Sequence, residues 1–161
     1  MRCTCRVEAI AASVIAVVGT LLGVTVTHYF QGRALKRTEG FARDERLRQE
    51  RLQAYSAYAG ALVSYRRVLV ARWSYEHEPG HEDDNRAAQA RSDDLRSQAE
   101  QTLFRVEMLA GGDEIRRQAR EAFKKVSEVH KTDDACEHRR RRAQTNALIQ
   151  SYVVASRRDV G

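Results

Sequence analysis

Residues 41–75 read FARDERLRQERLQAYSAYAGALVSYRRVLVARWSY, and this stretch decides the fold class. Apolar side chains recur in it at roughly helical spacing, at Leu52, Tyr55, Ala59, Leu62, Leu69 and Trp73. The 161-residue chain contains one proline and nine glycines, so few residues interrupt a helix. We therefore predict an all-α protein and exclude a β-sandwich or barrel.

Three further helices follow from the same kind of pattern. Pro79-Gly80 ends the first helix, and Gly111-Gly112 ends a second, predicted over 85–110, whose apolar stripe is Leu95, Ala99, Leu103, Val106 and Ala110. A third helix, predicted over 114–131 with Asp113 as its cap, has the stripe Ile115, Ala119, Ala122, Val126 and Val129. Short connections favour an antiparallel bundle of three or four helices.

The fourth helix is predicted to begin after Thr132-Asp133-Asp134, a polar cluster suited to capping, and to end near residue 156. Its expected apolar side is Ala147, Leu148, Ser151, Tyr152 and Ala155.

Toward the N-terminus, residues 9–30 read AIAASVIAVVGTLLGVTVTHYF and contain no formal charge. As a helix they would span about 33 Å, close to the ~30 Å of a bilayer core. This predicts four parts, an extracytoplasmic tail at 1–8, a transmembrane helix at 9–30, a basic juxtamembrane neck at 31–51 and a helical bundle at 52–161. Cleavage of the apolar segment as a signal peptide is the alternative, and it would release a secreted helical protein.

Basic residues are more numerous after the apolar segment than before it, which predicts a single-pass protein of the bacterial plasma membrane with the N-terminus outside and the C-terminal domain cytoplasmic. Membrane lipids are then partners. The residues expected to face their headgroups are Arg33, Lys36, Arg37, Arg157 and Arg158.

Small residues share one face of the apolar segment, which includes a G-x-x-x-G pair. Such a face lets two membrane helices approach closely, so we expect a homo-oligomer packed through Ala12, Ala16, Gly19, Gly23 and Thr27.

Charge is distributed unevenly after the neck. Residues 73–84 carry five acidic and no basic groups, whereas 138–161 carry six basic groups and one acidic group. In an up-and-down bundle the two regions meet at the end far from the neck. We therefore predict a distal charge cluster of Glu76, Glu78, Glu82, Asp83 and Asp84 with Arg139, Arg140, Arg141 and Arg142.

Four consecutive arginines point around the whole circumference of a helix, and no aromatic residue is interleaved among them. Pairing with the acidic loop is thus the preferred interpretation, and we do not expect nucleic acid as a partner.

Residues that could carry catalysis are not found in a recognisable arrangement. There is no Ser-His-acid or Cys-His pattern and no phosphate-binding glycine loop, and the histidines and cysteines match no zinc spacing. We expect no enzyme, no cofactor and no metal.

The stretch 19–62 combines a glycine-containing apolar segment, the basic cluster Arg33 to Arg37, Phe41-Ala42-Arg43, the run RLRQERL at 46–52 and Ala54-Tyr55-Ser56. In these features it resembles uncharacterised small actinobacterial single-pass membrane proteins. The resemblance implies a bacterial plasma-membrane protein and no site residue.

These patterns favour a membrane-anchored cytoplasmic scaffold or protein-interaction module that binds copies of itself and an unknown protein partner. A membrane-tethered regulator that binds nucleic acid is the alternative.

Overall fold

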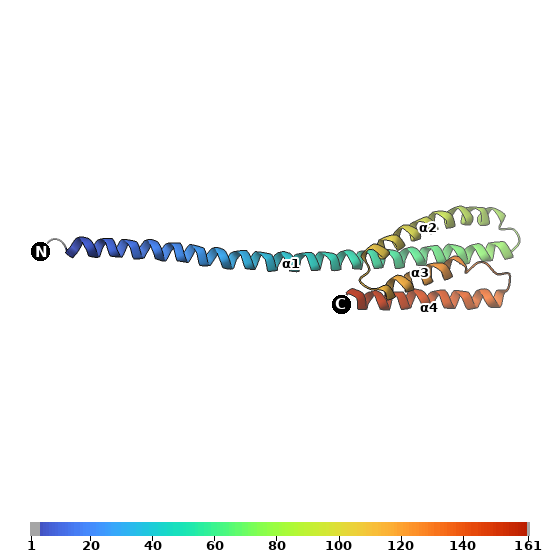
Figure 1. Ribbon diagram of the computed structural model, residues 1–161. Helices are drawn as coiled ribbons and strands as arrows, with labels where there is room; N and C mark the ends of the chain where they lie inside the picture. The colour runs from blue at the N-terminus through green and yellow to red at the C-terminus, as the bar shows by residue number, and fades with distance from the viewer. Residues whose placement is uncertain (1–3, 161) are drawn as a thin grey trace. The chain divides into compact units, whose positions relative to one another are not determined.

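A computed structural model describes the backbone of residues 4–160 and the side chains of residues 41–160. Over this range the chain is helical and contains no strand (Figure 1). The helices are α1 (Thr4–His77), α2 (Glu82–Leu109), α3 (Asp113–Ser127) and α4 (Ala135–Val160). Each predicted turn lies between two of them.

The predicted N-terminal parts follow one another along a single helix, α1, and their boundaries remain a prediction. One helix of 74 residues includes the predicted transmembrane helix, the neck and the first bundle helix. Gly32 and Gly40 do not end it, because a glycine costs a helix only about 1 kcal/mol relative to alanine. Every residue from 41 to 49 is exposed, as expected for a charged neck.

The membrane prediction is also corrected. Within the part of the chain that the structure describes, no helix combines the length and apolar character needed to cross a bilayer. The predicted span at 9–30 lies outside the described side chains, as do Ala12, Ala16, Gly19, Gly23 and Thr27. The predicted fold class with its transmembrane helix, and the single-pass plasma-membrane location, are therefore contradicted and are not retained.

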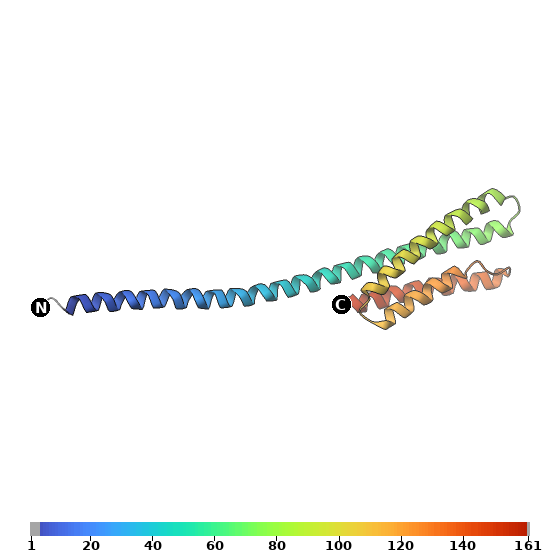
Figure 2. The same ribbon diagram turned by 45° about the horizontal axis from the view of Figure 1, so that its top comes forward.

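The chain divides into two compact units, Met1–Arg46 and Leu47–Gly161. The second unit contains the end of α1 and all of α2, α3 and α4. Within it, α2 runs beside α1, and α3 runs beside α4, in both views of the ribbon (Figures 1 and 2). The turns at 78–81 and 128–134 lie at one end of this unit, and the connection at 110–112 lies at the other.

The core of the second unit is built from tyrosines on α1 and small residues on α3. Tyr58 and Tyr152 are fully buried and meet edge to face, with ring centroids 5.2 Å apart. The Tyr58 hydroxyl donates to the backbone oxygen of Ala119 over 2.7 Å, a contact that a small side chain at Ala119 leaves room for. The stripes expected on the second and third helices are buried or half-buried throughout.

Three expected core positions are wrong. Leu52 is 58% exposed, and Ala147 and Ser151 lie on the outer side of α4. α4 instead buries His138, Thr145, Ile149, Tyr152 and Ser156. Polar atoms on this face are tolerated because the Thr145 and Ser156 hydroxyls donate to backbone oxygens one turn earlier.

The helix starts differ in how they are capped. Asp134 caps α4 as predicted, since its carboxylate accepts hydrogen bonds from the backbone nitrogens of Cys136 (3.0 Å) and Glu137 (3.1 Å). At α3, Gly112 occupies the N-cap position, and Asp113 is the first helical residue rather than the predicted cap.

Candidate functional site

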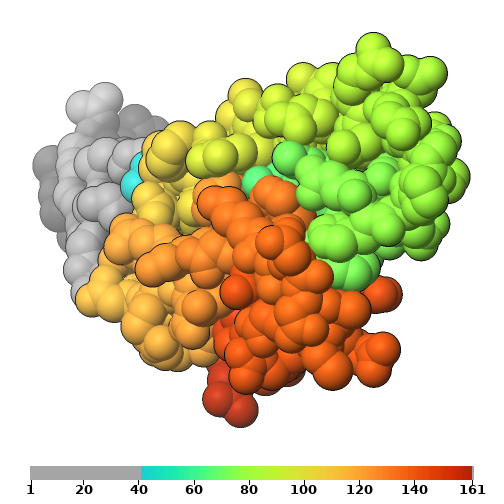
Figure 3. Space-filling model, turned by 90° about the vertical axis from the view of Figure 1, so that its right-hand side faces the viewer, coloured from blue at the N-terminus to red at the C-terminus, as the bar shows by residue number. Residues whose placement is uncertain are grey.

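The turn after α1 and the start of α4 lie at the same end of the bundle, as the distal cluster requires. Figure 3 looks onto this end and shows residues of α1 and α2 beside residues of α3 and α4. The ion pairs, however, are local. Glu76 pairs with Arg72 at 2.9 Å and Asp84 with His81 at 3.0 Å.

The remaining charges of the predicted cluster also use near neighbours. Asp83 pairs with Arg86, Glu78 lies 4.0 Å from His81, and Glu82 is exposed. Among residues 41–160 no ion pair joins these acidic groups to Arg139, Arg140, Arg141 or Arg142. Partners three or four residues apart on a helix need little ordering of the chain to meet, so they are favoured over partners on another element.

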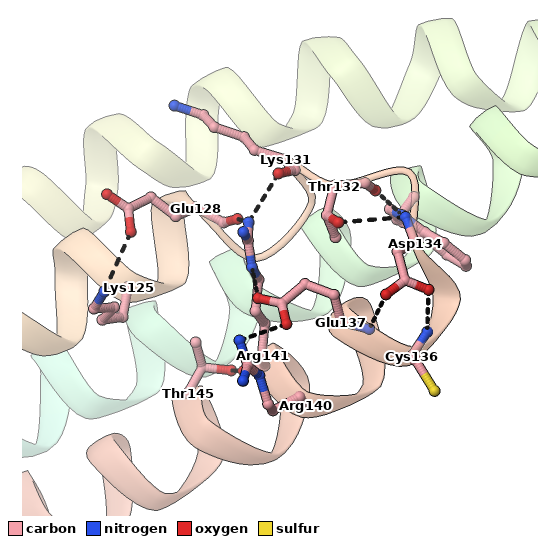
Figure 4. Close-up of polar contacts among 11 residues, drawn as sticks. Lys125, Glu128, Lys131, Thr132, Asp134, Cys136, Glu137, Arg140, Arg141 and Thr145 are labelled. Atoms are coloured by element: carbon pink, nitrogen blue, oxygen red, sulfur yellow. Dashed lines mark hydrogen bonds and ion pairs between the residues drawn. The ribbon is translucent and has the colours of Figure 1, made fainter.

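Arg141 points into the bundle and stabilises the connection between α3 and α4 (Figure 4). Its Nε donates to Glu137 at 2.8 Å, and its Nη1 donates to the backbone oxygens of Glu128 (2.9 Å) and Lys131 (2.8 Å). Arg140 pairs with the other oxygen of Glu137 at 2.6 Å. Two of the four consecutive arginines therefore share one glutamate, Glu137, which the sequence analysis did not single out.

A surface hollow of about 660 Å³ lies beside this cluster. Both signs of charge line it, so it presents no uniform field to a ligand; its residues are Lys125, Glu128, Glu137, Arg140, Arg141, Ala143, Gln144 and Thr145.

The packing of α1 on α4 assembles a basic surface. Arg66 Nε donates to the Thr145 hydroxyl at 3.1 Å, and Arg66 Nη2 donates to the backbone oxygen of Arg142 at 3.2 Å. Residues 51–75 and 138–158 contain no acidic side chain, and they contact each other through Arg66 with Thr145 and Tyr58 with Tyr152. The acidic Asp159 lies just beyond them and accepts from Tyr55. We define the arginine face as Arg66, Arg67, Arg139, Arg142 and Arg157.

The electrostatics of this face show that cations accumulate without counter-charges. Burial, and then the charge of Arg142, lower the pKa of Arg66 below its ordinary value. No ion pair among residues 41–160 involves a member of the arginine face. The predicted headgroup residues Arg157 and Arg158 are exposed at the end of α4, whereas Arg33, Lys36 and Arg37 lie outside the described side chains.

A second polar cluster closes the other end of the bundle. The Tyr55 hydroxyl donates to Asp159 at 2.5 Å, and the same carboxylate accepts a hydrogen bond from the Gly111 nitrogen at 3.2 Å. Arg51 donates to the Leu109 backbone oxygen at 2.8 Å. Burial is the main cause that raises the pKa of Tyr55, followed by the hydrogen bond to Asp159, so the phenol stays protonated.

Two histidine rings stack on Trp73. The rings of His77 and His138 stack on it with centroids 4.1 and 4.0 Å away, and its indole nitrogen donates to the Thr132 backbone oxygen at 2.5 Å. Burial, then the nearby Arg142, lower the pKa of His138. In the part of the chain that the structure describes, no three His, Cys, Asp or Glu side chains are placed to hold a metal ion.

Two large apolar side chains remain on the outer face of α2, which the sequence analysis did not identify. Phe104 is 61% exposed and Met108 is 77% exposed. They are four residues apart and so lie on the same side of the helix. The sequence could have identified them, because neither residue belongs to the predicted buried stripe of this helix.

Comparison with known proteins gives one family. The model of the KilB plasmid transfer protein family matches residues 52–160, which include the end of α1 and all of α2, α3 and α4. Neither curated proteins nor solved structures gave a match to the chain.

Proposed function

Because the chain belongs to the family of KilB plasmid transfer proteins, we propose that its helical bundle is a protein-interaction module that joins copies of itself during plasmid transfer. The proposal gives the module no enzymatic activity. The observation that carries it is the exposed pair Phe104 and Met108 on α2.

The two side chains have the properties of an interface centre. Large aromatic side chains contribute heavily to protein association, and methionine adapts its shape to an apposed surface. In a twofold-symmetric dimer with antiparallel α2 helices, Phe104 of each copy would contact Met108 of the other. The contact is reciprocal, so one pair of residues supplies both halves of the interface.

The test is sedimentation velocity of the full chain over a range of concentrations. We expect the wild type to form dimers or larger assemblies. Replacing both side chains, Phe104→Ser with Met108→Ser, should raise the dissociation constant about 30-fold, which corresponds to loss of ~2 kcal/mol at an interface centre.

The matched control is Val153→Ser with Val154→Ser, which removes two exposed apolar side chains from α4. It should leave association unchanged. A wild type that is monomeric throughout, or a Phe104/Met108 variant that associates as tightly as the wild type, would refute the proposal. In mating assays the Phe104/Met108 variant should lower the plasmid transfer frequency, and the control should not.

A further inference from the structure

We propose that the arginine face binds the phosphate backbone of double-stranded DNA without regard to base sequence. This partner goes beyond the proposed self-association, and a different side of the bundle carries it. The reason lies in what the packing of α1 on α4 brings together.

The face is continuous along α4. Arg139 and Arg157 are 18 residues apart, which is about five turns, so they lie on the same side of the helix about 27 Å from each other. Arg142, Asn146 and Gln150 share that side between them, and all three are exposed. Along this side of α4 the described exposed residues are cations, amides and small apolar side chains (Ala143, Val153 and Val154), with no acidic group.

α1 extends the face sideways. Arg66 reaches across to α4, where, among residues 41–160, its guanidinium donates only to neutral oxygens, namely the Thr145 hydroxyl and the Arg142 backbone oxygen. These contacts fix the direction of the guanidinium and leave its charge uncompensated. Arg67, the next residue of α1, points about 100° further round the helix and is exposed.

The dimensions and chemistry favour a duplex. Double-stranded DNA carries about one charge per 1.7 Å of its axis, so 27 Å of the face would lie against a segment with roughly 16 phosphates. Arginine and side-chain amides are common donors to phosphate oxygens. A protein partner would be expected to meet a large apolar anchor, and the exposed large hydrophobic residues between the arginines are valines only, Val63, Val153 and Val154.

The test is fluorescence anisotropy of the full chain with a labelled duplex of about 30 base pairs, longer than the face, at several NaCl concentrations. We expect log K to fall with log salt with a slope of about −4.5, since roughly five arginines each contribute about −0.9. A second duplex of unrelated sequence should bind with the same affinity and slope.

The informative variant is Arg139→Gln with Arg157→Gln, which should reduce the magnitude of the slope by about 2 and weaken binding to both duplexes alike. Its matched control, Arg91→Gln with Arg105→Gln, removes the same charge from exposed positions on α2 and should keep the wild-type slope. Far-UV circular dichroism of both variants should match the wild type.

Several outcomes would overturn the inference, namely no binding to the duplex at low salt, equal slopes in the two double variants, or tighter binding to phosphatidylserine vesicles or polyglutamate than to the duplex. The Phe104→Ser, Met108→Ser variant should keep the wild-type slope. Failure of DNA binding and failure of self-association are thereby distinguishable.

Discussion

At the scale of single residues, the stack of His138 on Trp73 combines an ionisable ring with a buried position. His138 is 3% exposed, and its Nε2 has no hydrogen-bond partner among the described residues. A proton on this ring would be poorly solvated and would face the charge of Arg142, which is why its pKa is lowered. The fold therefore favours the neutral ring.

Because the folded state favours the neutral ring of His138, the free energy of unfolding depends on pH, and the sign of this dependence follows from the lowered pKa. Below about pH 6.5 the unfolded chain binds a proton that the folded His138 resists, so the free energy of unfolding falls as the pH drops. His130 acts in the same direction, since burial lowers its pKa as well. The half-buried His81, whose pKa the hydrogen bond to Asp84 raises, acts in the opposite direction.

The variant His138→Phe tests the assignment. It keeps an aromatic ring against Trp73 but cannot bind a proton. We expect the free energy of unfolding, measured by urea titration between about pH 7.5 and 5.5, to decline less in the variant than in the wild type. Equal declines in the two proteins would show that His138 is not responsible.

At the scale of elements, the helix boundaries follow from local chemistry. Pro79-Gly80, Gly111-Gly112 and Thr132-Asp133-Asp134 were predicted as turns, and each lies between two helices in the structure. Gly80 adopts φ 87°, a backbone conformation that other residues rarely take. Glycine at 32 and 40 has no such effect, since a helix tolerates an isolated glycine and neither lies next to a proline or a second glycine.

The cap of α4 can be tested in isolation. Asp134→Ala removes the acceptor for two backbone nitrogens and should lower the free energy of unfolding by about 1 kcal/mol. The matched variant Asp133→Ala changes a fully exposed carboxylate that lies 3.8 Å from the Nε2 atom of His77. Chemical denaturation should show a loss for the first variant and almost none for the second; similar losses would contradict the assignment.

The four helices were not predicted equally well. α3 buries the expected stripe because Ile115, Ala119, Ala122 and Val126 recur strictly at three- and four-residue spacing. On α4 the apolar residues are few, and alanine, serine and threonine fit either side of a helix. The period alone therefore did not determine which face of α4 packs inward.

At the scale of the whole molecule, contacts distant in sequence close the bundle. Tyr55 and Asp159 are 104 residues apart, and Asp159 also binds the Gly111 nitrogen. The hydrogen bonds thus join α1, the end of α4 and the connection between α2 and α3. No local pattern identifies this cluster, because each member taken alone is an ordinary tyrosine, aspartate or glycine.

Tyr55→Phe removes the donor and leaves the ring in the core. We expect it to lower the free energy of unfolding by about 2 kcal/mol, the range for a hydrogen bond to a charged group. Tyr75→Phe is the comparison, since Tyr75 is half-buried and no hydrogen bond of its hydroxyl is described. Guanidinium titrations in which both variants match the wild type would argue against the role of the Asp159 contact.

The sequence by itself determined the helical class, the turns and most of the buried faces, because these depend on the spacing of apolar residues and on the caps within a few positions of each other. It did not determine which charges meet. The acidic loop was expected to pair with the arginine run, but the ion pairs form between residues close in sequence. Arg141 contacts Glu137 and the backbone oxygens of Glu128 and Lys131. Only the packing of α1 on α4 brought Arg66 beside Arg142 and formed the arginine face, since that contact is set by how tyrosines and small residues fill a shared core.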